Sequence, residues 1–514
     1  MRIGIDVGGT NTDAVLMDGE RVVVSVKTST AEDVTSGIVA ALDGLRQRHA
    51  FEPADVRAVM IGTTHFINAL IERRRLAPTA VIRLGLPATA ALPPMVGWPE
   101  DLVEAIEGRA YMCHGGHEFD GRKISDLDVD ELKRVASDMA AHGISSVAIT
   151  SVFSPVTSEF ELRAAEVIQA ELGEVDVSLS HEIGRMGLLE RENATVINAS
   201  LRSLARHIVS GLAEAVRGHG IAAPLYLSQN DGTLMDLDFA LRYPVVTFAS
   251  GPTNSMRGAA MLSGLGDCAV VDIGGTTSDV GIVRGGFPRE AGTDVTVAGI
   301  RTNFRMPDVV SIGIGGGSLV RFEGAEAQVG PKSVGFRLPQ RAMVFGGGTL
   351  TATDVAVAAG RAKIGDPSLV AHLDRDLVSA ALDVIVRRVV ASVERMRTSP
   401  EPLPVVAVGG GSILLPDQLE GVEVHRPENY SVANAVGAAI AQVGGEVDRV
   451  YSIEAGGRAR ALDEARQEAV DRAIKAGASP GTVEVVEVEE VPLAYLPGNA
   501  TRIQVKAVGA LQIS

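Results

Sequence analysis

The chain has 514 residues, of which 46% are apolar and 22% charged, and its net charge is −17. Contact with nucleic acid needs a basic surface, so this balance argues against a nucleic-acid partner. Its two cysteines, Cys113 and Cys268, exclude a disulfide scaffold and a metal site built from several cysteines.

In the first half of the chain, short apolar strands alternate with amphipathic helices. Strands are predicted over 2–8, 12–18, 20–28, 56–64, 77–85, 145–154 and 175–183, and helices over 33–49, 65–75, 128–143, 158–172 and 188–220. The segment from about 87 to 120 is rich in Pro and Gly and is predicted to be an irregular insertion. This alternation indicates an α/β fold with largely parallel sheets.

The second half begins the pattern again. Strands are predicted over 223–232, 244–250, 267–273 and 402–408, and helices over 253–264, 374–398 and 431–445. The tail from Val447 is predicted as strand, helix, strand, strand, a small α+β extension. We expect a first half-domain over 1–190, a second over 191–446 and the extension over 447–514.

An octapeptide recurs in the two halves. Residues 6–13 read DVGGTNTD and residues 272–279 read DIGGTTSD, and five of the eight positions are identical. Apolar runs flank both copies, so each is predicted as strand, Gly-rich turn, strand. One copy alone is explained as well by an ordinary hairpin. Two copies at equivalent places predict two related half-domains that face each other across a cleft.

The octapeptides have the composition of a phosphate site. Consecutive glycines expose backbone N–H groups to an anion. Asp6 and Asp272 end apolar strands, where carboxylates suit Mg²⁺ bound to a polyphosphate. A third Gly-rich turn, Gly409 to Ser412 in VVAVGGGS, would let a flat ring lie against backbone, although 312–320 and 343–351 look similar.

These three motifs resemble the phosphate and adenosine motifs of the sugar kinase/heat-shock 70/actin superfamily. The ordered set GIDVGGTNTDAVLMD, GTTHFINALIERR, ERENATVINASL, SQNDGTLM, SGPTNSMRGAA, VDIGGTTSDVGIV, IGIGGGSLV and TATDVAVAAG resembles more narrowly the A-type members of the hydantoinase/oxoprolinase family. The resemblance implies two actin/hexokinase-like (ribonuclease H-like) half-domains around a nucleotide cleft. The family more often has small residues where this chain has His65-Phe66-Ile67.

The resemblance implies ATP-dependent opening of a cyclic amide, such as a hydantoin or 5-oxoproline, through phosphorylation of the amide oxygen. It implies a second hydrolase subunit as the partner. The sequence is also compatible with a homo-oligomer of this chain. The implied roles are Mg²⁺ binding by Asp6 and Asp272, and contacts to ATP by Gly8, Gly9, Thr10, Asn11, Thr12, Gly274, Gly275, Thr276, Thr277, Gly409, Gly410, Gly411 and Ser412.

Other candidates have structural alternatives. Thr63, Thr64 and Asn68 lie at a strand–helix junction, where they would contact substrate or cap the helix. Asp13 and Asp279 would position water or metal, or satisfy their own turns. The polar residues Glu190, Arg191 and Asn193 would bind ligand or form a solvated face, and His114 and His117 would bind metal or only line a loop.

Two other functions stay open: a small-molecule kinase of the same superfamily, and a nucleotide-switched regulatory or binding protein. The chain begins MRIGIDVGG, without an apolar leader, and no run reaches about 18 consecutive apolar residues. We therefore expect a cytoplasmic protein without membrane contact.

Overall fold

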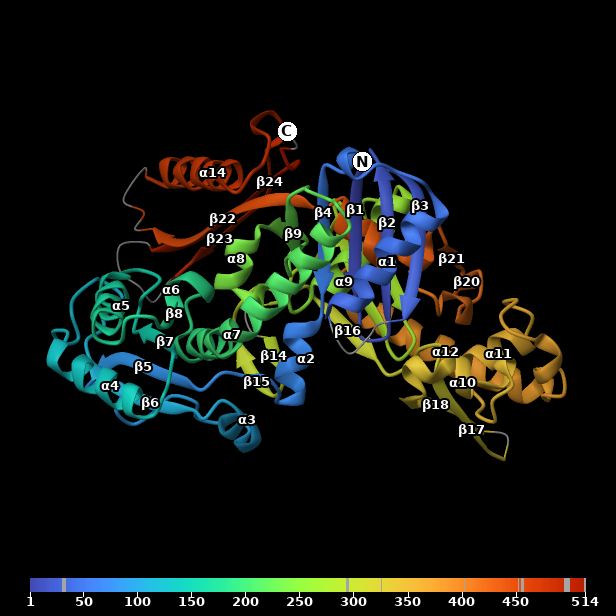
Figure 1. Ribbon diagram of the computed structural model, residues 1–514, viewed down its shortest axis with the longest axis horizontal. Helices are drawn as coiled ribbons and strands as arrows, with labels where there is room; N and C mark the ends of the chain where they lie inside the picture. The colour runs from blue at the N-terminus through green and yellow to red at the C-terminus, as the bar shows by residue number, and fades with distance from the viewer. Residues whose placement is uncertain are drawn as a thin grey trace.

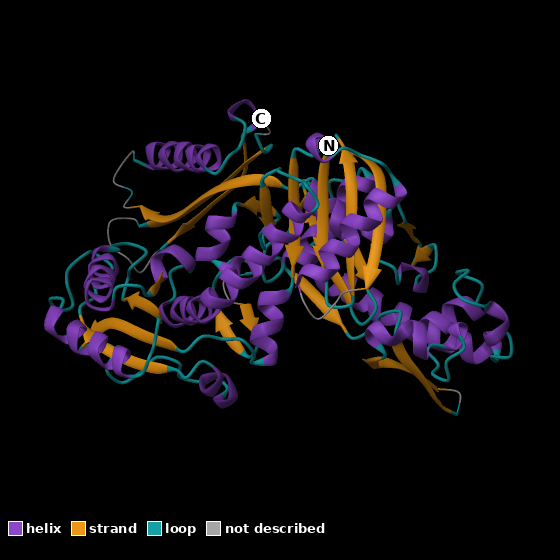
Figure 2. Cartoon of the chain, viewed as in Figure 1, coloured by secondary structure: helices purple, strands orange, loops and turns teal. Residues whose placement is uncertain are grey.

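The computed structural model describes residues 1–29, 34–292, 295–324, 326–401, 403–451, 453, 457–493 and 500–512. It has the α/β class expected from the sequence, with three main sheets and helices packed on them (Figures 1 and 2). Among these residues, no helix combines the length and the apolar character needed to cross a membrane.

The first sheet has nine strands in the order β23-β24-β22-β10-β9-β4-β1-β2-β3. Its strands are β1 (Arg2–Val7), β2 (Asn11–Asp18), β3 (Arg21–Ser29), β4 (Ala58–Thr63), β9 (Leu225–Ser228), β10 (Thr233–Met235), β22 (Gln442–Tyr451), β23 (Glu484–Pro492) and β24 (Thr501–Gly509). The C-terminal tail has the predicted strand, helix, strand, strand order, and its strands lengthen this first sheet.

The second sheet has the order β13-β12-β11-β19-β21-β20, with β16 paired to β12. Its strands are β11 (Cys268–Ile273), β12 (Ser278–Arg284), β13 (Phe287–Pro288), β16 (Val309–Ile312), β19 (Val405–Val408), β20 (Gln418–Leu419) and β21 (Val422–His425). In both sheets an antiparallel hairpin is followed by a parallel neighbour, β1–β2 with β4 and β11–β12 with β19. The repeated octapeptide therefore marks a repeated sheet motif, as predicted.

A third sheet of four parallel strands lies at one end of the molecule with α4 and α5 (Figure 1). Its order is β6 (Arg109–His114), β5 (Thr79–Leu86), β7 (Ser146–Ser151) and β8 (Asp176–Leu179). At the other end lie α10–α12 beside the hairpin of β17 (Ser318–Glu323) and β18 (Glu326–Ser333). A short hairpin joins β14 (Val295–Val297) and β15 (Ile300–Thr302).

The helices follow the predicted pattern in most places. They are α1 (Val34–Arg48), α2 (His65–Glu72), α3 (Glu100–Ala105), α4 (Val129–Ala141), α5 (Glu159–Leu172), α6 (Ser180–Ile183), α7 (Leu188–Gly218), α8 (Leu237–Arg242), α9 (Ser250–Ser263), α10 (Leu338–Arg341), α11 (Ala352–Ala358), α12 (Arg375–Met396), α13 (Ala433–Ala439) and α14 (Arg458–Lys475).

Four predictions of local structure were wrong. The helix predicted over 431–445 ends at Ala439, and β22 begins at Gln442. The expected irregular insertion contains α3 and β6. β6 is an edge strand in which only Cys113 is buried, and its short apolar run over 110–113 stands among Pro and Gly residues that favour irregular structure. The predicted strand over 244–250 is a 3₁₀ turn, Pro244–Thr247, because Pro244 begins a helical turn and α9 follows directly. The strand predicted over 175–183 ends at Leu179, where α6 begins.

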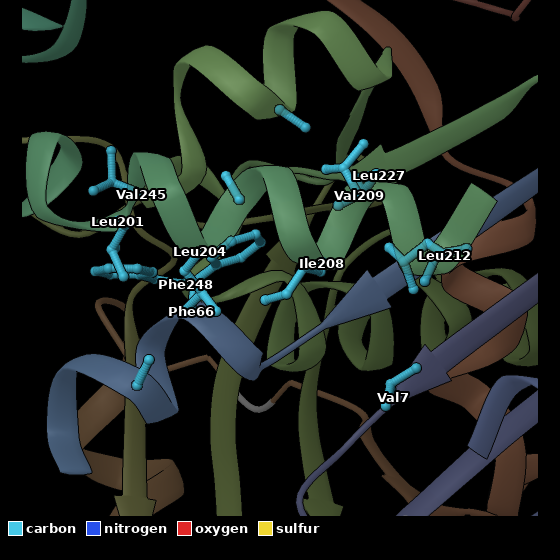
Figure 3. Packing of buried hydrophobic residues seen from close by; sticks show 14 of the residues in the cluster. Val7, Phe66, Leu201, Leu204, Ile208, Val209, Leu212, Leu227, Val245 and Phe248 are labelled. Carbon is cyan, nitrogen blue, oxygen red and sulfur yellow. The ribbon is translucent and has the colours of Figure 1, made fainter. Parts of the chain in front are cut away.

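The main core lies between the first sheet and α7. Figure 3 shows Leu204 and Ile208 of α7 beside Phe66 of α2 and Phe248, all of them buried. This packing fixes α2 and the residues before it against the carboxyl end of β1 and β4, where the candidate site lies.

Candidate functional site

The two hairpins have the same register. Asp6 of β1 lies opposite Asp13 of β2, and Asp272 of β11 lies opposite Asp279 of β12. The four carboxylates that were predicted from the octapeptides thus stand at equivalent positions in the two sheets.

The two turns also have the same backbone. Gly8 N–H donates to the Asn11 carbonyl at 3.0 Å, and Gly274 N–H donates to the Thr277 carbonyl at 2.9 Å. The predicted phosphate-binding residues of both copies lie in or beside these turns: Gly8, Gly9, Thr10, Asn11, Thr12, Gly274, Gly275, Thr276 and Thr277. Each turn follows the end of a buried strand.

The turns of the two sheets border each other. A Cβ atom built on Gly275 would lie 3.7 Å from Thr10 Cγ2, which is ordinary van der Waals contact. Among the residues that the structure describes, no atom would lie within 4 Å of a Cβ built on Gly9. Two Gly-rich turns that approach from opposite sheets could hold one polyphosphate between them.

Asp6 is buried and shares a donor with Asp13. The Asn434 amide donates to Asp6 Oδ2 at 3.0 Å and to Asp13 Oδ2 at 2.9 Å, and Asn254 Nδ2 lies 3.5 Å from Asp6 Oδ1. Lys27 Nζ lies 2.6 Å from Asp13 Oδ1. Burial raises the pKa of Asp6 to about 6, and the charge of Asp13 adds to the rise against the two amide bonds.

The second pair of carboxylates has a related environment. Burial raises the pKa of Asp272, against a hydrogen bond from Ser255. Burial also raises the pKa of Asp279 to about 6, although the Ser311 hydroxyl donates to it. The charge of Asp272 contributes to the raised pKa of both Asp6 and Asp279, so the two hairpins act on each other electrostatically.

A glycine lies beside the carboxylate of Asp6 and another beside that of Asp272. Gly62 belongs to β4, the parallel neighbour of β1, and Gly409 follows β19, the parallel neighbour of β11. A Cβ on Gly62 would lie 2.3 Å from Asp6 Oδ1, and one on Gly409 would lie 2.3 Å from Asp272 Oδ1. Real Cβ atoms do not approach so closely, so only glycine leaves these carboxylates in place.

The cluster fits a divalent cation. Asp6 and Asp13 are buried and Asp272 and Asp279 are half-buried. Burial raises the pKa of Asp6, Asp272 and Asp279, so a cation among them would stabilise their charged forms. Within the described chain the buried Oδ1 of Asn254 has no hydrogen-bond donor, although its amide nitrogen faces Asp6. Carboxylate and amide oxygens are the ligands that Mg²⁺ takes.

The third Gly-rich segment lies directly beside the second hairpin. Gly411 N–H donates to the Ile273 carbonyl at 2.8 Å, and Gly409 N–H donates to the Tyr430 carbonyl at 3.0 Å. A Cβ on Gly410 would meet nothing within 4 Å, so this backbone is open on one side. The hydroxyl of Ser412 is buried and has no partner among the described residues.

The similar-looking motif at 312–320 has a different place. Gly316 N–H donates to the Gly274 carbonyl at 3.0 Å, and Gly317 N–H donates to the Gly275 carbonyl at 2.7 Å. This loop therefore packs against the second Gly-rich turn, and its glycines let the backbone of the loop contact the backbone of the turn.

The predicted substrate residues lie at the end of β1 and β4. The Thr64 hydroxyl and backbone N–H both lie 3.3 Å from the Val7 carbonyl, next to the first turn. Thr63 Oγ1 lies 2.6 Å from His65 Nδ1. Asn68 Nδ2 lies 3.4 Å from Thr64 Oγ1, one helical turn away. These contacts place the junction beside the first turn and also give its side chains a structural role.

The other candidates lie away from the hairpins. Arg191 is buried, and it donates to Ser180 Oγ at 2.9 Å and to the Ser151 carbonyl at 2.8 Å, so neither a ligand site nor a solvated face describes it. Asn193 accepts a hydrogen bond from Trp98 at 2.8 Å. Glu190 lies 3.4 Å from the exposed Arg301.

The two histidines of the 87–120 segment have different partners. His117 packs on Phe160 with ring centroids 4.3 Å apart. His114, Asp128 and Glu131 have potential ligand atoms within 4.8 Å of one another. The carboxylates of Asp128 and Glu131 already accept backbone N–H groups at the start of α4 and the end of β6, which explains the group without a metal.

The sequence analysis did not predict the polar side chains that contact the carboxylates, nor the glycine that leaves space for Asp6. The polar residues are Lys27, Asn254, Ser255, Ser311 and Asn434, and the glycine is Gly62. Asn254 and Asn434 come from α9 and α13, both of which were predicted as helices without a role for these side chains. A Cβ on Gly437 would lie 1.8 Å from the Asn254 carbonyl, so the two helices pack backbone against backbone. An Asn among Gly and Ala in such a helix is the signal that the sequence offered.

Comparison with known proteins gives matches over most of the chain. The model for the hydantoinase/oxoprolinase N-terminal region matches residues 2–172, and the hydantoinase/oxoprolinase model matches residues 191–368. Together they cover more than half of the chain.

Curated relatives are about a quarter identical to the chain within the aligned regions. The alpha subunit of the caprolactamase of Pseudomonas jessenii is 27% identical over 466 residues, which are 85% of this chain and 65% of the relative. The gamma subunit of the acetophenone carboxylase of Aromatoleum aromaticum is 25% identical over 70% of this chain and 53% of the relative. The chain thus spans between about half and two thirds of the length of these two relatives.

Solved structures show the same fold. The ATP-dependent caprolactamase from Pseudomonas jessenii superimposes with a TM-score of 0.80 and 19% identity, over 100% of this chain and 88% of that chain. Nucleotide-free acetone carboxylase gives a TM-score of 0.70 and 18% identity, also over 100% and 88%.

Proposed function

The chain belongs to the hydantoinase/oxoprolinase family, and on this premise we propose that it uses ATP and Mg²⁺ to open the ring of a cyclic amide. The observation that carries the proposal is the pair of matching hairpins, which bring Asp6 and Asp272 from two sheets to one place beside two Gly-rich turns. The names of the relatives support a cyclic amide as substrate, since two of them are a caprolactamase and a 5-oxoprolinase.

In this proposal the backbone N–H groups of the two turns bind the phosphates of ATP, and Gly409 to Ser412 lie against the adenosine. The second contact is supported by two observations among the described residues: a Cβ on Gly410 would meet no atom within 4 Å, and the Ser412 hydroxyl has no hydrogen-bond partner. Asp6 and Asp272 hold Mg²⁺, with Asn254 Oδ1 as a further oxygen beside Asp6. The ion would neutralise charge on the transferred phosphoryl group.

An amide carbonyl is a poor electrophile, and phosphorylation of its oxygen removes that obstacle. The amide oxygen attacks the γ-phosphorus, and ADP leaves. Water then adds to the activated carbon, and the ring C–N bond breaks as the nitrogen takes up a proton. A second water adds to the same carbon, releases phosphate and leaves the ring-opened carboxylate. The protein contributes position and charge, because the phosphoryl transfer itself needs little covalent help.

The names of the relatives also support a partner protein. Two relatives carry subunit names, alpha and gamma. We therefore propose that a second protein completes hydrolysis after this chain has activated the amide.

The experiment is ADP release from the purified chain with Mg²⁺ and a panel of cyclic amides, followed by detection of the ring-opened carboxylate. Asp272→Asn is the matched variant, because it keeps the shape of the side chain and removes its charge. We expect ADP release that depends on one cyclic amide and falls at least about a hundredfold in the variant. Undiminished release in Asp272→Asn would contradict the proposal.

A ketone is the second candidate substrate, because one relative belongs to an acetophenone carboxylase. The enol oxygen of a ketone would accept the phosphoryl group in the same place. Ketones tested in the same panel distinguish the two substrate classes, since only a cyclic amide gives a product with both an amine and a carboxylate.

A further inference from the structure

A row of facing residues crosses the first sheet at the candidate site and ends at a lysine. Asp6 of β1 pairs with Asp13 of β2, and Asp13 pairs in turn with Lys27 of β3. Residues directly opposite each other in antiparallel strands have their side chains on the same face of the sheet. The Lys27 side chain therefore lies on the face that carries the two carboxylates.

The second sheet has the same row without the lysine. Asp272 of β11 pairs with Asp279 of β12, and Asp279 pairs with Ser311 of β16, whose hydroxyl donates to it. Ser311 thus occupies the position that Lys27 has in the first sheet. Among the residues that the structure describes, no other Lys or Arg forms an ion pair with any of the four aspartates. The two rows therefore differ by one positive charge, which lies beside the first hairpin.

The Lys27 ammonium is held by Asp13 and remains accessible. Its Nζ lies 2.6 Å from Asp13 Oδ1 and 2.8 Å from Oδ2, and 35% of the lysine side chain is exposed, against 4% for Asp13. An ammonium has three N–H donors and this carboxylate has two oxygens, so one donor is left for a ligand. Burial raises the pKa of Asp272, and the charge of Lys27 acts against that rise. The charge of Lys27 thus acts on both hairpins.

The order of the site indicates which phosphate lies beside Lys27. The segment assigned to adenosine, Gly409 to Ser412, packs on the second hairpin. The junction assigned to the substrate packs on the first hairpin, where the Thr64 N–H lies 3.3 Å from the Val7 carbonyl. An ATP molecule that extends from the adenosine segment towards the substrate places its terminal phosphate beside the first hairpin. The charge of Lys27 lies on that side of the site.

We propose that Lys27 binds the terminal phosphate of ATP through its ammonium and positions the phosphoryl group that the amide oxygen attacks. The inference rests on the function proposed above and adds to it the residue that distinguishes ATP from ADP. A hydrogen bond from an ammonium to a phosphate is charge-assisted, and such bonds are roughly twice as strong as neutral ones. ADP has no phosphate at this position, so the contact favours ATP.

The test is isothermal titration calorimetry of the whole chain in Mg²⁺ with two nucleotides: ADP, and the β,γ-imido analogue of ATP, which is not hydrolysed. In Lys27→Met we expect the affinity for the analogue to fall about tenfold and the affinity for ADP to change less than about twofold, because only the analogue loses a charge-assisted hydrogen bond. Lys27→Arg should lose less, since it keeps the positive charge. Lys133→Met is the matched control, because Lys133 also faces a carboxylate, Glu171 at 3.8 Å, in the four-stranded part of the molecule.

Lys27→Gln keeps a donor for Asp13 without the charge, and it replaces Lys27→Met in the test if that variant does not fold. It should lose the preference for the analogue in the same way. An equal loss of affinity for both nucleotides would overturn the inference, because Lys27 would then act only by balancing Asp13. Wild-type affinity of the Lys27 variants for both nucleotides would overturn the inference alone. A wild-type chain that binds neither nucleotide would contradict the proposed function as well.

Discussion

At the scale of single residues, Asn434 has the most unusual position, because its one amide nitrogen donates to two carboxylates. Asp6 and Asp13 repel each other, and the shared donor keeps their oxygens together where a cation can use them. The residue comes from α13, whereas both carboxylates lie on the first hairpin.

We expect Asn434→Leu to lower the free energy of unfolding by about 1–3 kcal/mol, because two buried oxygens lose a donor. We also expect weaker Mg²⁺ binding and at least about tenfold slower ADP release. Thermal denaturation and a Mg²⁺ titration measure the two effects separately. A variant that is less stable but binds Mg²⁺ like the wild type would show that Asn434 acts only on stability.

The raised pKa of Asp6 makes the stability of the folded chain depend on pH. This pKa of about 6 lies above the ordinary value near 3.8, so the folded protein binds this proton more tightly than the unfolded chain does. The contribution of Asp6 to stability is therefore present at low pH and is lost as the pH rises from about 4 to about 6. In metal-free protein at pH 7.5, Asp6→Asn should raise the free energy of unfolding by about 1–3 kcal/mol.

The same variant should lose Mg²⁺-dependent ADP release, since Asn cannot replace the charge. Denaturation of metal-free wild type and Asp6→Asn at low and neutral pH checks the stability. If the variant is no more stable than the wild type at pH 7.5, then Asp6 is not under the electrostatic strain described here.

At the scale of elements, the two hairpins and the two glycines that support their aspartates form a repeated unit. Gly62→Ala would place a methyl group 2.3 Å from Asp6 Oδ1 and push that carboxylate out of the cluster. We expect at least about tenfold slower ADP release with the fold retained. Gly218→Ala at the end of α7 is the matched control, because its Cβ would meet nothing within 4 Å. Equal activity in both variants would contradict the supporting role of Gly62.

The elements also show how far the sequence could predict the site. The hairpins, their aspartates and the long helix α7 follow from local patterns of apolar residues and glycines. Asn254 and Asn434 do not, because they meet Asp6 across 248 and 428 positions of the chain. The strand β6 was missed for a local reason. It lies at the edge of its sheet, five of its six residues remain at least partly exposed, and its short apolar run over 110–113 is a weak signal among the surrounding Pro and Gly residues.

At the scale of the whole molecule, the C-terminal tail belongs to the first sheet and is tied to the turn between β9 and β10. Lys506 of β24 lies 2.8 Å from Asp231 Oδ2, and both side chains are largely buried. Burial alone would raise the pKa of Asp231, but the Lys506 ammonium outweighs it and holds that pKa well below its usual range. The stability that this pair provides is thus present at neutral pH and is lost in acid.

Lys506→Met should lower the free energy of unfolding at neutral pH by about 3 kcal/mol, because it leaves Asp231 buried without its cation. Lys475→Met on the exposed face of α14 is the control. Chemical denaturation of both variants is the measurement. A loss of the same size in both, or in neither, would show that the tail does not depend on this ion pair.

The central claim is the proposal that the residues of the two hairpins bind ATP and direct its phosphoryl group to an amide oxygen. The most direct measurement uses a cyclic amide labelled with oxygen-18 in its carbonyl group, turned over with ATP and Mg²⁺ in the presence of the partner protein if the chain requires one. The account predicts that the label appears in inorganic phosphate, because the amide oxygen stays bonded to phosphorus when the carboxylate is released. Unlabelled phosphate, with the label retained in the carboxylate, would contradict it.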